Sequence, residues 1–228
     1  MLYTAQNARD NIRNRDGKRV FYLGKGDSLT SEARDYLQRE RIEILPAEQA
    51  RREETEVLGG GFTREKPEEL THLNGQLLVR KTHPRIAFRG AVDSLEAELL
   101  LCGMRIPTLR DALEEALTLA RALLAADVLE RDLGEVRLGG MDGDALRKRS
   151  HFPQDYYGTP HFMPRFSDGE AILHLNSCRC KARQAELLAV DAFSDRDGKL
   201  LRRDIVQALN RLSSFLYLLM IQEKAKSR

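Results

Sequence analysis

The chain has 228 residues, enough for one domain with a small extension, and a body of this size buries about 70% of its unfolded surface, so folding needs no metal or disulfide. Its 37 basic and 35 acidic side chains give a net charge of +2 and are well mixed, without a basic block or interleaved aromatic residues, which argues against nucleic acid as a partner. Three cysteines and no recognisable secretory leader predict a reducing cytoplasm, and the longest apolar run, near residues 215–221, is too short to cross a bilayer.

Residues 1–57 are predicted to form a small α/β extension. Short apolar runs at 20–23 and 42–45 indicate two strands. Between them, Thr30 or Ser31 can cap a helix, because the side-chain oxygen of a capping residue accepts a hydrogen bond from a free amide of the first turn. The predicted order is therefore strand, helix, strand.

A polar stretch from Pro46 to about Lys66 separates this extension from the rest of the chain. It carries an Arg-Arg-Glu-Glu run and three consecutive glycines, and it lacks both the helical and the strand period of apolar residues. We interpret its last part, residues 58–67, as a linker. A second domain then covers residues 68–228.

Helical periodicity dominates this second domain. Apolar residues recur at intervals of three and four, with Thr108 and Asp168 as caps of two of the helices. The predicted helices cover residues 88–104, 108 to about 133, 145–149, 168–193 and 201 onward. The sequence therefore predicts an all-α fold, a four- to five-helix up-and-down bundle that carries the small α/β extension. The segment at 139–165 is rich in glycine, proline and aromatic residues and is predicted to be a long loop, and such loops are usually functional.

The last helix combines an apolar end with two polar residues. Every residue from 215 to 221 is apolar or aromatic, so this segment has no face for water. Asn210 and Arg211 lie one to two turns earlier, where an unpaired amide or charge would be costly to desolvate. This combination indicates a buried polar site whose partners are other protein groups or a ligand.

A stripe of polar residues occupies one face of the preceding helix. Arg179, Arg183 and Glu186 are spaced by four and three residues, which aligns them on one face, and Asn176 extends the stripe. A solvated row of salt-bridged side chains would give the same pattern, because exposed ion pairs are common and individually weak. The stripe and the polar pair of the last helix together favour a binding site.

These two motifs resemble those of a known family. Arg-x-x-x-Arg-x-x-Glu at 179–186, a turn-rich break and Leu-Asn-Arg-Leu-Ser at 209–213 are similar to the cobalamin adenosyltransferases, and more closely to their ethanolamine-utilisation type. The resemblance runs from about Pro67 to Lys224 and includes PEELTHLNGQLLVRKTHPRIAFRGAVDS at 67–94. It implies an ATP:cob(I)alamin adenosyltransferase, which moves the 5′-deoxyadenosyl group of ATP to Co(I) of a corrinoid and releases triphosphate. Mg²⁺ would accompany ATP and neutralise the triphosphate oxygens.

The resemblance also implies roles for individual residues. Arg183 and Asn210 match positions that contact ATP, and Glu186 completes the first motif. Arg179 matches an arginine that pairs with an aspartate at the position of Asp93, and we expect this pair to act in catalysis. An ordinary structural ion pair would look the same in the sequence. Arginine suits a triphosphate leaving group because its planar fork binds phosphate oxygens in bidentate fashion.

A basic segment before the first long helix provides candidate phosphate contacts. Related propanediol-associated enzymes have a glycine- and threonine-rich phosphate loop here, and this chain has Lys-Thr-His-Pro-Arg at 81–85 instead. Lys81, Arg85 and Arg89 are therefore our candidates for binding the triphosphate. The alternative is that one or more of them face solvent.

The long loop contains a candidate corrinoid contact. His-Phe-Met-Pro at 161–164 resembles the Phe-x-x-Pro loop of related enzymes, whose phenylalanine covers the lower face of the corrin and displaces the axial base. Phe162 would be the corresponding residue here and would act as a wedge against the corrin. Removal of the axial ligand makes Co(II) easier to reduce. Packing of this ring in the core is the alternative, because the match has one additional residue before the arginine helix.

The histidines and cysteines do not indicate a metal site. Some ethanolamine-type enzymes bind a divalent metal through a histidine and a cluster of cysteines ahead of the bundle, but residues 53–71 contain neither His nor Cys. Cys178 and Cys180 are two residues apart on a helix and point about 200° apart, so we interpret them as packed thiols. A pair formed by His174 and Cys178 on one face is the alternative.

The resemblance also suggests partners and rival functions. Related enzymes bind ATP between neighbouring bundles, so we expect a homo-oligomer, a dimer or a trimer, in which Asp93 and Arg179 meet across a subunit boundary. A corrinoid reductase and the proteins of a bacterial microcompartment are further candidate partners, and the expected location is the cytoplasm or the interior of such a compartment. Two other functions stay open: a non-catalytic adenosylcobalamin carrier, and a structural bundle whose extension docks onto a microcompartment shell.

Overall fold

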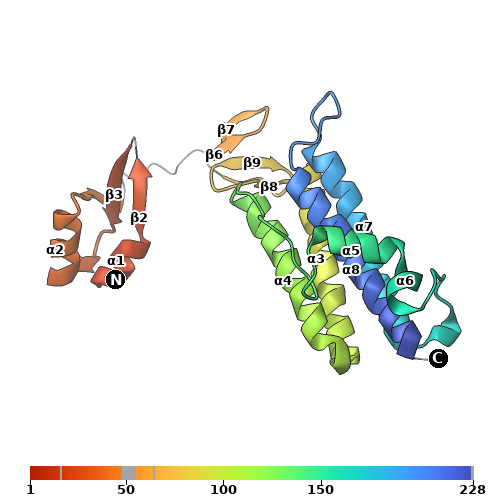
Figure 1. The fold of residues 1–228 in the computed structure, drawn as a ribbon. Coiled ribbons are helices and arrows are strands. Elements are labelled where there is room, and N and C mark those ends of the chain that lie inside the picture. Colours follow the sequence, from red (N-terminus) through yellow and green to blue (C-terminus); the bar gives the residue numbers. More distant parts are fainter. Residues whose placement is uncertain (16, 48–54, 64, 227–228) are drawn as a thin grey trace. The chain divides into compact units, whose positions relative to one another are not determined.

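The computed structural model describes residues 1–15, 17–47, 55–63 and 65–226. The chain divides into two compact units, Met1–Pro67 and Glu68–Arg228 (Figure 1). Each unit has its own cluster of buried apolar side chains. The Arg-Arg-Glu-Glu run of the polar stretch, residues 51–54, lies outside the described residues. In the described part of the chain, no helix is both long enough and apolar enough to cross a membrane.

The N-terminal unit is built around a small three-stranded sheet. Its elements are β1 (Leu2–Tyr3), α1 (Ala5–Asp10), β2 (Ile12–Arg15), β3 (Lys18–Leu23), β4 (Ser28–Leu29), α2 (Ser31–Arg39), β5 (Glu43–Pro46), β6 (Thr55–Val57) and β7 (Gly61–Thr63). β3 is central and pairs antiparallel with β2 and parallel with β5. Thr30 caps α2 by accepting a hydrogen bond from the amide of Ala33. Phe21 of β3 and Leu37 of α2 are fully buried in the core of this unit.

Four long helices make up most of the second unit (Figure 1). Its elements are β8 (Leu70–His72), β9 (Leu77–Arg80), α3 (Pro84–Arg105), η2 (Pro107–Leu109), α4 (Arg110–Val128), α5 (Gly143–His151), α6 (Pro153–Tyr157), η3 (Phe166–Asp168), α7 (Glu170–Phe193) and α8 (Arg203–Lys226). We call α3, α4, α7 and α8 the helical body.

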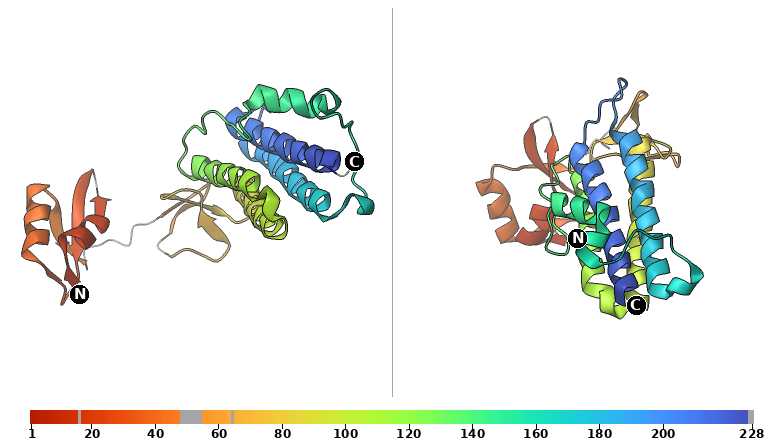
Figure 2. Two further views of the ribbon diagram at one scale, coloured as in Figure 1. Left: turned by 60° about the horizontal axis from the view of Figure 1, so that its bottom comes forward. Right: turned by 45° about the vertical axis from the view of Figure 1, so that its right-hand side comes forward.

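The ion pairs at the helix ends give the direction of each helix in the body. Arg85 at the start of α3 pairs with Asp127 at the end of α4, so these two helices are antiparallel. Arg105 at the end of α3 pairs with Glu170 at the start of α7, so α3 and α7 are antiparallel as well. α4 and α7 therefore run in the same direction, and the long connection between them carries α5 and α6 along α8 (Figure 2).

The core of the helical body is densest around α7 and α8. α7 packs against both α3 and α8, and its fully buried positions include Ala182, Ala185 and Ala189, whose small side chains let the neighbouring helices approach closely. α8 is buried continuously from Leu218 to Ile221, because α7 covers one side of it and α5 and α6 cover another. The apolar end of the last helix therefore has no face for water.

The prediction of an all-α fold is wrong. The described residues form nine short strands besides eight α-helices, so the fold is mixed α/β. β8 and β9 pair antiparallel directly before α3, and the side chain of Asn74 in their turn accepts hydrogen bonds from the amides of Gln76 and Leu77. β6 and β7 form another antiparallel pair. Strands of three or four residues are too short for an alternating pattern to stand out in a sequence.

The helix ends also differ from the predicted ones. α4 ends at Val128 rather than near residue 133, because Glu130 adopts a left-handed conformation with φ of 51°. Thr108 lies in η2 and does not cap α4. Asp168 belongs to η3, and its carboxylate bonds Lys224 instead of an amide of α7.

Candidate functional site

The two polar motifs of the sequence meet where α7 packs on α8. The Asn210 amide nitrogen of α8 donates a hydrogen bond to Oε1 of Glu186 on α7 over 2.9 Å. The Asn210 carbonyl oxygen accepts a hydrogen bond of 2.6 Å from Nη1 of Arg211. Arg183 and Arg179 follow Glu186 along the same edge of α7, at helical spacings of three and seven residues. We call this row the α7–α8 edge.

Two arginines of the α7–α8 edge carry unbalanced positive charge. Arg183 is exposed, and no described residue forms a hydrogen bond or ion pair with its side chain. Arg179 is half-buried, and its Nη2 and Nε donate to Oδ1 of Asn176 over 2.9 and 3.2 Å. Within the described residues, neither guanidinium is within ion-pair distance of a carboxylate. Such a pair of groups suits an anionic ligand, above all a phosphate.

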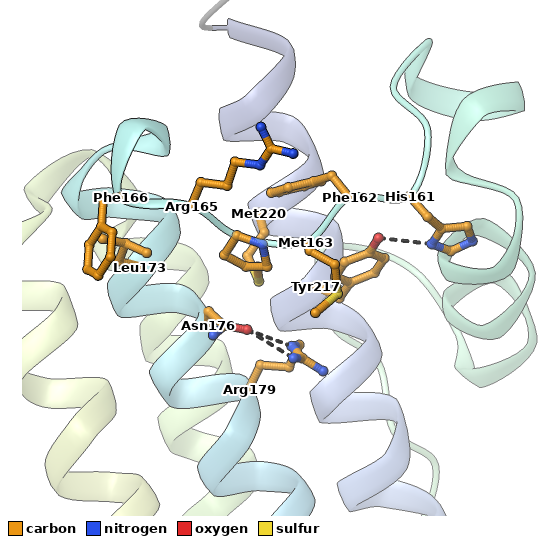
Figure 3. A pocket seen from close by; sticks show the side chains of 11 residues that line it. His161, Phe162, Met163, Arg165, Phe166, Leu173, Asn176, Arg179, Tyr217 and Met220 are labelled. Atoms are coloured by element: carbon orange, nitrogen blue, oxygen red, sulfur yellow. Dashed lines mark hydrogen bonds between the residues drawn. The ribbon is translucent and has the colours of Figure 1, made fainter.

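A cavity of about 600 Å³ lies beside Arg179, between α7, α8 and the loop after α6 (Figure 3). Arg179 and Asn176 face it from α7, and Tyr217 faces it from α8. Its other walls are mainly apolar and include Phe162, Met163, Pro164, Phe166, Leu173 and Met220. Because Met163 and Phe166 are 83% and 98% exposed, the loop offers large apolar side chains to a ligand. The cavity therefore suits a broad, mostly apolar molecule with an anionic or polar edge.

We call the loop after α6 the cavity loop. One contact that fixes it joins His161 to Tyr217 of α8. His161 Nε2 lies 3.2 Å from the carbonyl oxygen of His151, which can only accept, so Nδ1 is the nitrogen that accepts from the Tyr217 hydroxyl at 2.9 Å. Burial raises the pKa of Tyr217, which keeps this hydroxyl protonated as a donor. The Phe162 ring stacks near Tyr217 with 6.4 Å between ring centroids. The side chains of His161 and Tyr217 thus place Phe162.

A second contact fixes the loop on the other side of Phe162. Lys224 Nζ lies 2.5 Å from Oδ1 of Asp168 and 5.7 Å from the centroid of the Phe162 ring. The other carboxylate oxygen of Asp168 accepts from the amide of Arg165 at 2.7 Å. The hydrogen bond from Lys224 holds the pKa of the Asp168 carboxyl below its ordinary value, so this contact is present at neutral pH and is lost only as the pH falls through that lowered pKa.

Arg85 and Arg89 lie in a different place from the α7–α8 edge. Both bond the fully buried carboxylate of Asp127: Nε of Arg85 is 2.8 Å from Oδ1, and Nε of Arg89 is 2.6 Å from Oδ2. We call these three residues the Asp127 cluster. The Arg85 guanidinium also lies 5.9 Å from the ring centroid of Phe193, at the end of α7. Arg183 is ten residues before Phe193, which is about 15 Å along the helix.

The basic segment before α3 is likewise engaged with neighbouring groups. Lys81 is exposed and its Nζ lies 3.8 Å from a carboxylate oxygen of Glu68. His83 caps α3, and its Nδ1 accepts from the amide of Arg85. Burial, with Arg85 and Arg89 nearby, lowers the pKa of His83, which fits a neutral ring that accepts this bond. Within one chain, the structure does not bring these residues to the α7–α8 edge.

Asp93 also lies away from Arg179 within one chain. It is exposed on α3, and no described residue pairs with its carboxylate. Glu96, three residues on, pairs with Arg121 of α4, so Asp93 lies on the exposed side of α3 near its border with α4. Arg179 lies on the edge of α7 that faces α8. A pair between Asp93 and Arg179 would therefore need two chains.

The cysteines are not arranged as a metal site. Cys102 and Cys178 are buried and Cys180 is exposed, so the expectation of a packed thiol fits Cys178 and not Cys180. The neighbouring thiol of Cys102, together with burial, raises the pKa of Cys178 and keeps it protonated. Among the described residues, no group of three or more His, Cys, Asp and Glu side chains is placed so that it could hold a metal ion.

Comparison with known proteins identifies the family. The family model described as cobalamin adenosyltransferase matches residues 61–223. The chain belongs to this family. The resemblance seen in the two motifs is thereby confirmed, and all the predicted site residues lie within the matched range.

The curated relatives of this family member are named corrinoid adenosyltransferases. EutT of Salmonella typhimurium is 37% identical over 166 residues, and EutT of Escherichia coli strain K12 is 36% identical over the same length. Each match covers 71% of this chain and 61% of the relative, so the match spans about three fifths of the length of these relatives. No solved structure matches the chain.

Sequence reasoning missed several residues that this family member places at the site. Tyr217 and Lys224 hold the cavity loop, and Arg165 lines the cavity. Tyr217 could have been found from the sequence, because a phenol hydroxyl within an apolar run that has no face for water needs a buried partner. Lys224 and Arg165 could not, since their roles depend on where the loop folds back onto α8.

Proposed function

We propose that this protein is an ATP:cob(I)alamin adenosyltransferase. One observation carries the proposal: the hydrogen bond between Glu186 and Asn210 joins the two polar motifs of the family. It lies beside an open apolar cavity and two arginines that no described carboxylate pairs with. Membership of the family supports it, as do the EutT relatives, which are named corrinoid adenosyltransferases.

In the proposed reaction, the electron pair of Co(I) attacks C5′ of ATP as the bond from C5′ to the triphosphate oxygen breaks. Cobalt is formally oxidised to Co(III), and the triphosphate leaves with the bonding electrons. Negative charge grows on the leaving oxygen, so a fixed cation and a fixed donor aimed at it lower the barrier. We assign these roles to Arg183 and Asn210, whose free hydrogen-bonding groups lie along the α7–α8 edge.

Mg²⁺ would neutralise part of the triphosphate charge when it is bound with ATP. Glu186 is the carboxylate that fits this ion, because only its Oε1 bonds Asn210 and no described residue uses its Oε2. A site with one carboxylate, phosphate oxygens and water matches the usual protein ligands of Mg²⁺.

We assign the cavity beside Arg179 to the corrin ring. Phe162 and Met163 supply apolar surface for the flat macrocycle, and Arg165 and Arg179 supply positive charge for its polar periphery. Phe162 would press on the lower face of the ring and exclude an axial ligand. The contacts of Tyr217 and Lys224 support this role, because a wedge must be held in place.

The wedge role predicts a selective effect of Phe162→Ala. ATP binding should be unchanged, but reduction of Co(II) to Co(I) should become harder, so turnover should fall with a weak reductant and recover with a strong one. Phe152→Ala is the matched control, because that ring is 56% exposed and is not part of the cavity wall. If Phe162→Ala turns over as well as the wild type with both reductants, Phe162 only packs the loop.

We further propose that the active form is a homo-oligomer, a dimer or a trimer. The outer face of α3 carries Leu100, Leu101 and Met104, which are 49%, 58% and 72% exposed, on the same side as the unpaired Asp93. Exposed apolar residues around a lone charge suit an interface with a complementary charge. Arg179 of a second copy would supply that charge and would place Asp93 at the ATP site.

Membership of the family supports a proposal for the location and the other partners. We place the protein in the cytoplasm or inside a bacterial microcompartment for ethanolamine utilisation, with a corrinoid reductase as the supplier of electrons. A corrinoid carrier without activity is the second candidate, and the apolar cavity alone would serve it. Arg183, with which no described residue pairs, favours the transferase, because a carrier needs no triphosphate contact.

Anaerobic turnover of chemically reduced cob(I)alamin with Mg-ATP tests the proposed function. We expect the Co(I) absorbance to disappear as adenosylcobalamin forms. Protein treated with a chelator and resupplied only with Mg²⁺ should turn over equally, because the proposed chemistry uses no protein-bound metal other than Mg²⁺. If neither sample turns over and corrinoid stays bound, the transferase proposal fails and the carrier takes its place.

A further inference from the structure

Arg211 carries a buried positive charge that no described carboxylate balances. Arg211 is only 7% exposed, and its buried Nε has no hydrogen-bond partner among the described residues. No ion pair among the described residues includes it. Burying an unpaired guanidinium is strongly unfavourable, so Arg211 does not stabilise the fold.

The Asn210 amide lies between this guanidinium and the carboxylate of Glu186. Its oxygen accepts 2.6 Å from Nη1 of Arg211, and its nitrogen donates 2.9 Å to Oε1 of Glu186. If the amide were flipped, its NH₂ group would face a cation that only donates and its oxygen would face a carboxylate that only accepts. The two charges therefore fix one orientation of the Asn210 side chain.

The first residue of α5 restricts the Arg211 guanidinium from the other side. Gly143 lies so close that a Cβ atom there would be 3.4 Å from Nε of Arg211 and 3.8 Å from its Cγ and Cδ. Arg211 is thereby confined between α5 and Asn210. It can hold the amide oxygen without swinging toward solvent.

We propose that Arg211 is a positioning residue for ATP, which fixes the Asn210 amide so that its second N–H points to an oxygen of the nucleotide. The side-chain nitrogen of Asn210 has two N–H groups, and Glu186 accepts from only one of them. The inference rests on the proposed function, because it needs ATP at the α7–α8 edge. It adds that Asn210 serves as a donor and that Arg211 acts only through it.

Arg211→Met tests this role because methionine fills a similar space without charge. The KM for Mg-ATP should rise about tenfold, as expected for one misplaced hydrogen bond to a charged group, while kcat changes less. The Tm should stay equal or rise, because an apolar residue replaces an unpaired buried charge. Arg211→Lys keeps a donor near the amide oxygen and should restore part of the affinity.

Arg202→Met is the matched control. Arg202 pairs with Asp204 over 2.8 Å and bonds the carbonyl oxygen of Arg131, near the start of α8 and away from Asn210. This variant should lower the Tm and leave the KM for Mg-ATP unchanged. Arg211→Met is expected to do the opposite, with a raised KM and a Tm that stays equal or rises. This contrast would distinguish a positioning role from a stabilising one.

The outcomes distinguish the inference from the proposed function. Wild-type protein that neither turns over cob(I)alamin nor binds Mg-ATP in calorimetry refutes the proposed function, and the inference with it. Active wild type together with a wild-type KM in Arg211→Met refutes the inference alone. If Arg211→Met does not fold, Arg211→Leu decides, because leucine also removes the donor to the amide oxygen and a wild-type KM in that variant overturns the positioning role.

Discussion

Arg183→Ala is expected to lower kcat/KM for adenosyl transfer by about a hundredfold or more, with no change in Tm. The size follows from the loss of one fixed group that stabilises charge on a leaving oxygen, for which effects on the order of 10²–10³ are usual. The fold should be unaffected, because the side chain is exposed and no described residue bonds it. Anaerobic assays with saturating cob(I)alamin and varied Mg-ATP, paired with thermal melts, measure both quantities.

Arg110→Ala is the control for this substitution. Arg110 is also an exposed arginine on a long helix without a partner among the described residues, but it lies at the start of α4, outside the α7–α8 edge. It removes the same charge from the protein and should leave turnover near the wild-type level. Near-normal turnover in Arg183→Ala would contradict the ATP role of Arg183, whatever the control does.

The α7–α8 edge could be predicted because its information is local. Arg179, Arg183 and Glu186 share a face through helical spacing alone, and a short turn brings the next helix, with Asn210, back along it. The burial of Arg211 could be predicted because this residue lies just before an apolar run. Neither conclusion required knowledge of contacts between distant segments.

The environment of Arg85 and Arg89 could not be predicted in the same way. Their partner, Asp127, follows 42 and 38 residues later, and a basic segment near a phosphate site looks the same whether it binds phosphate or a buried carboxylate. Asp127 itself had a signal, because it continues the buried spacing of Ala120 and Leu123 at a position where a charge needs a partner. The short strands β6 to β9 were missed because three or four residues show no reliable alternation.

Asp127→Asn is expected to lower the stability of the helical body by about 3–5 kcal/mol, the usual cost of removing one partner from a buried ion pair. Asp127 is fully buried, and the Arg85 and Arg89 side chains are only 17% and 15% exposed, so water compensates little for the lost charge. The amide would also turn a donor toward one of two guanidinium groups that only donate. For a chain of this length the Tm should fall by about 10 °C, measured by the helical circular dichroism signal.

Glu114→Gln removes an exposed carboxylate from the same helix and should change the stability by less than about 0.5 kcal/mol. A wild-type Tm in Asp127→Asn would contradict the structural role of the Asp127 cluster.

The KM for Mg-ATP of the folded Asp127→Asn variant, measured well below its Tm, then decides what Arg85 and Arg89 do. If Arg85 and Arg89 only anchor α3 to α4, the KM stays at the wild-type value, because Phe193, which the Arg85 guanidinium contacts, is about 15 Å along α7 from Arg183. If they bind the triphosphate, as the sequence predicted, releasing them from Asp127 changes the KM, and the loss of stability and the change in affinity appear together.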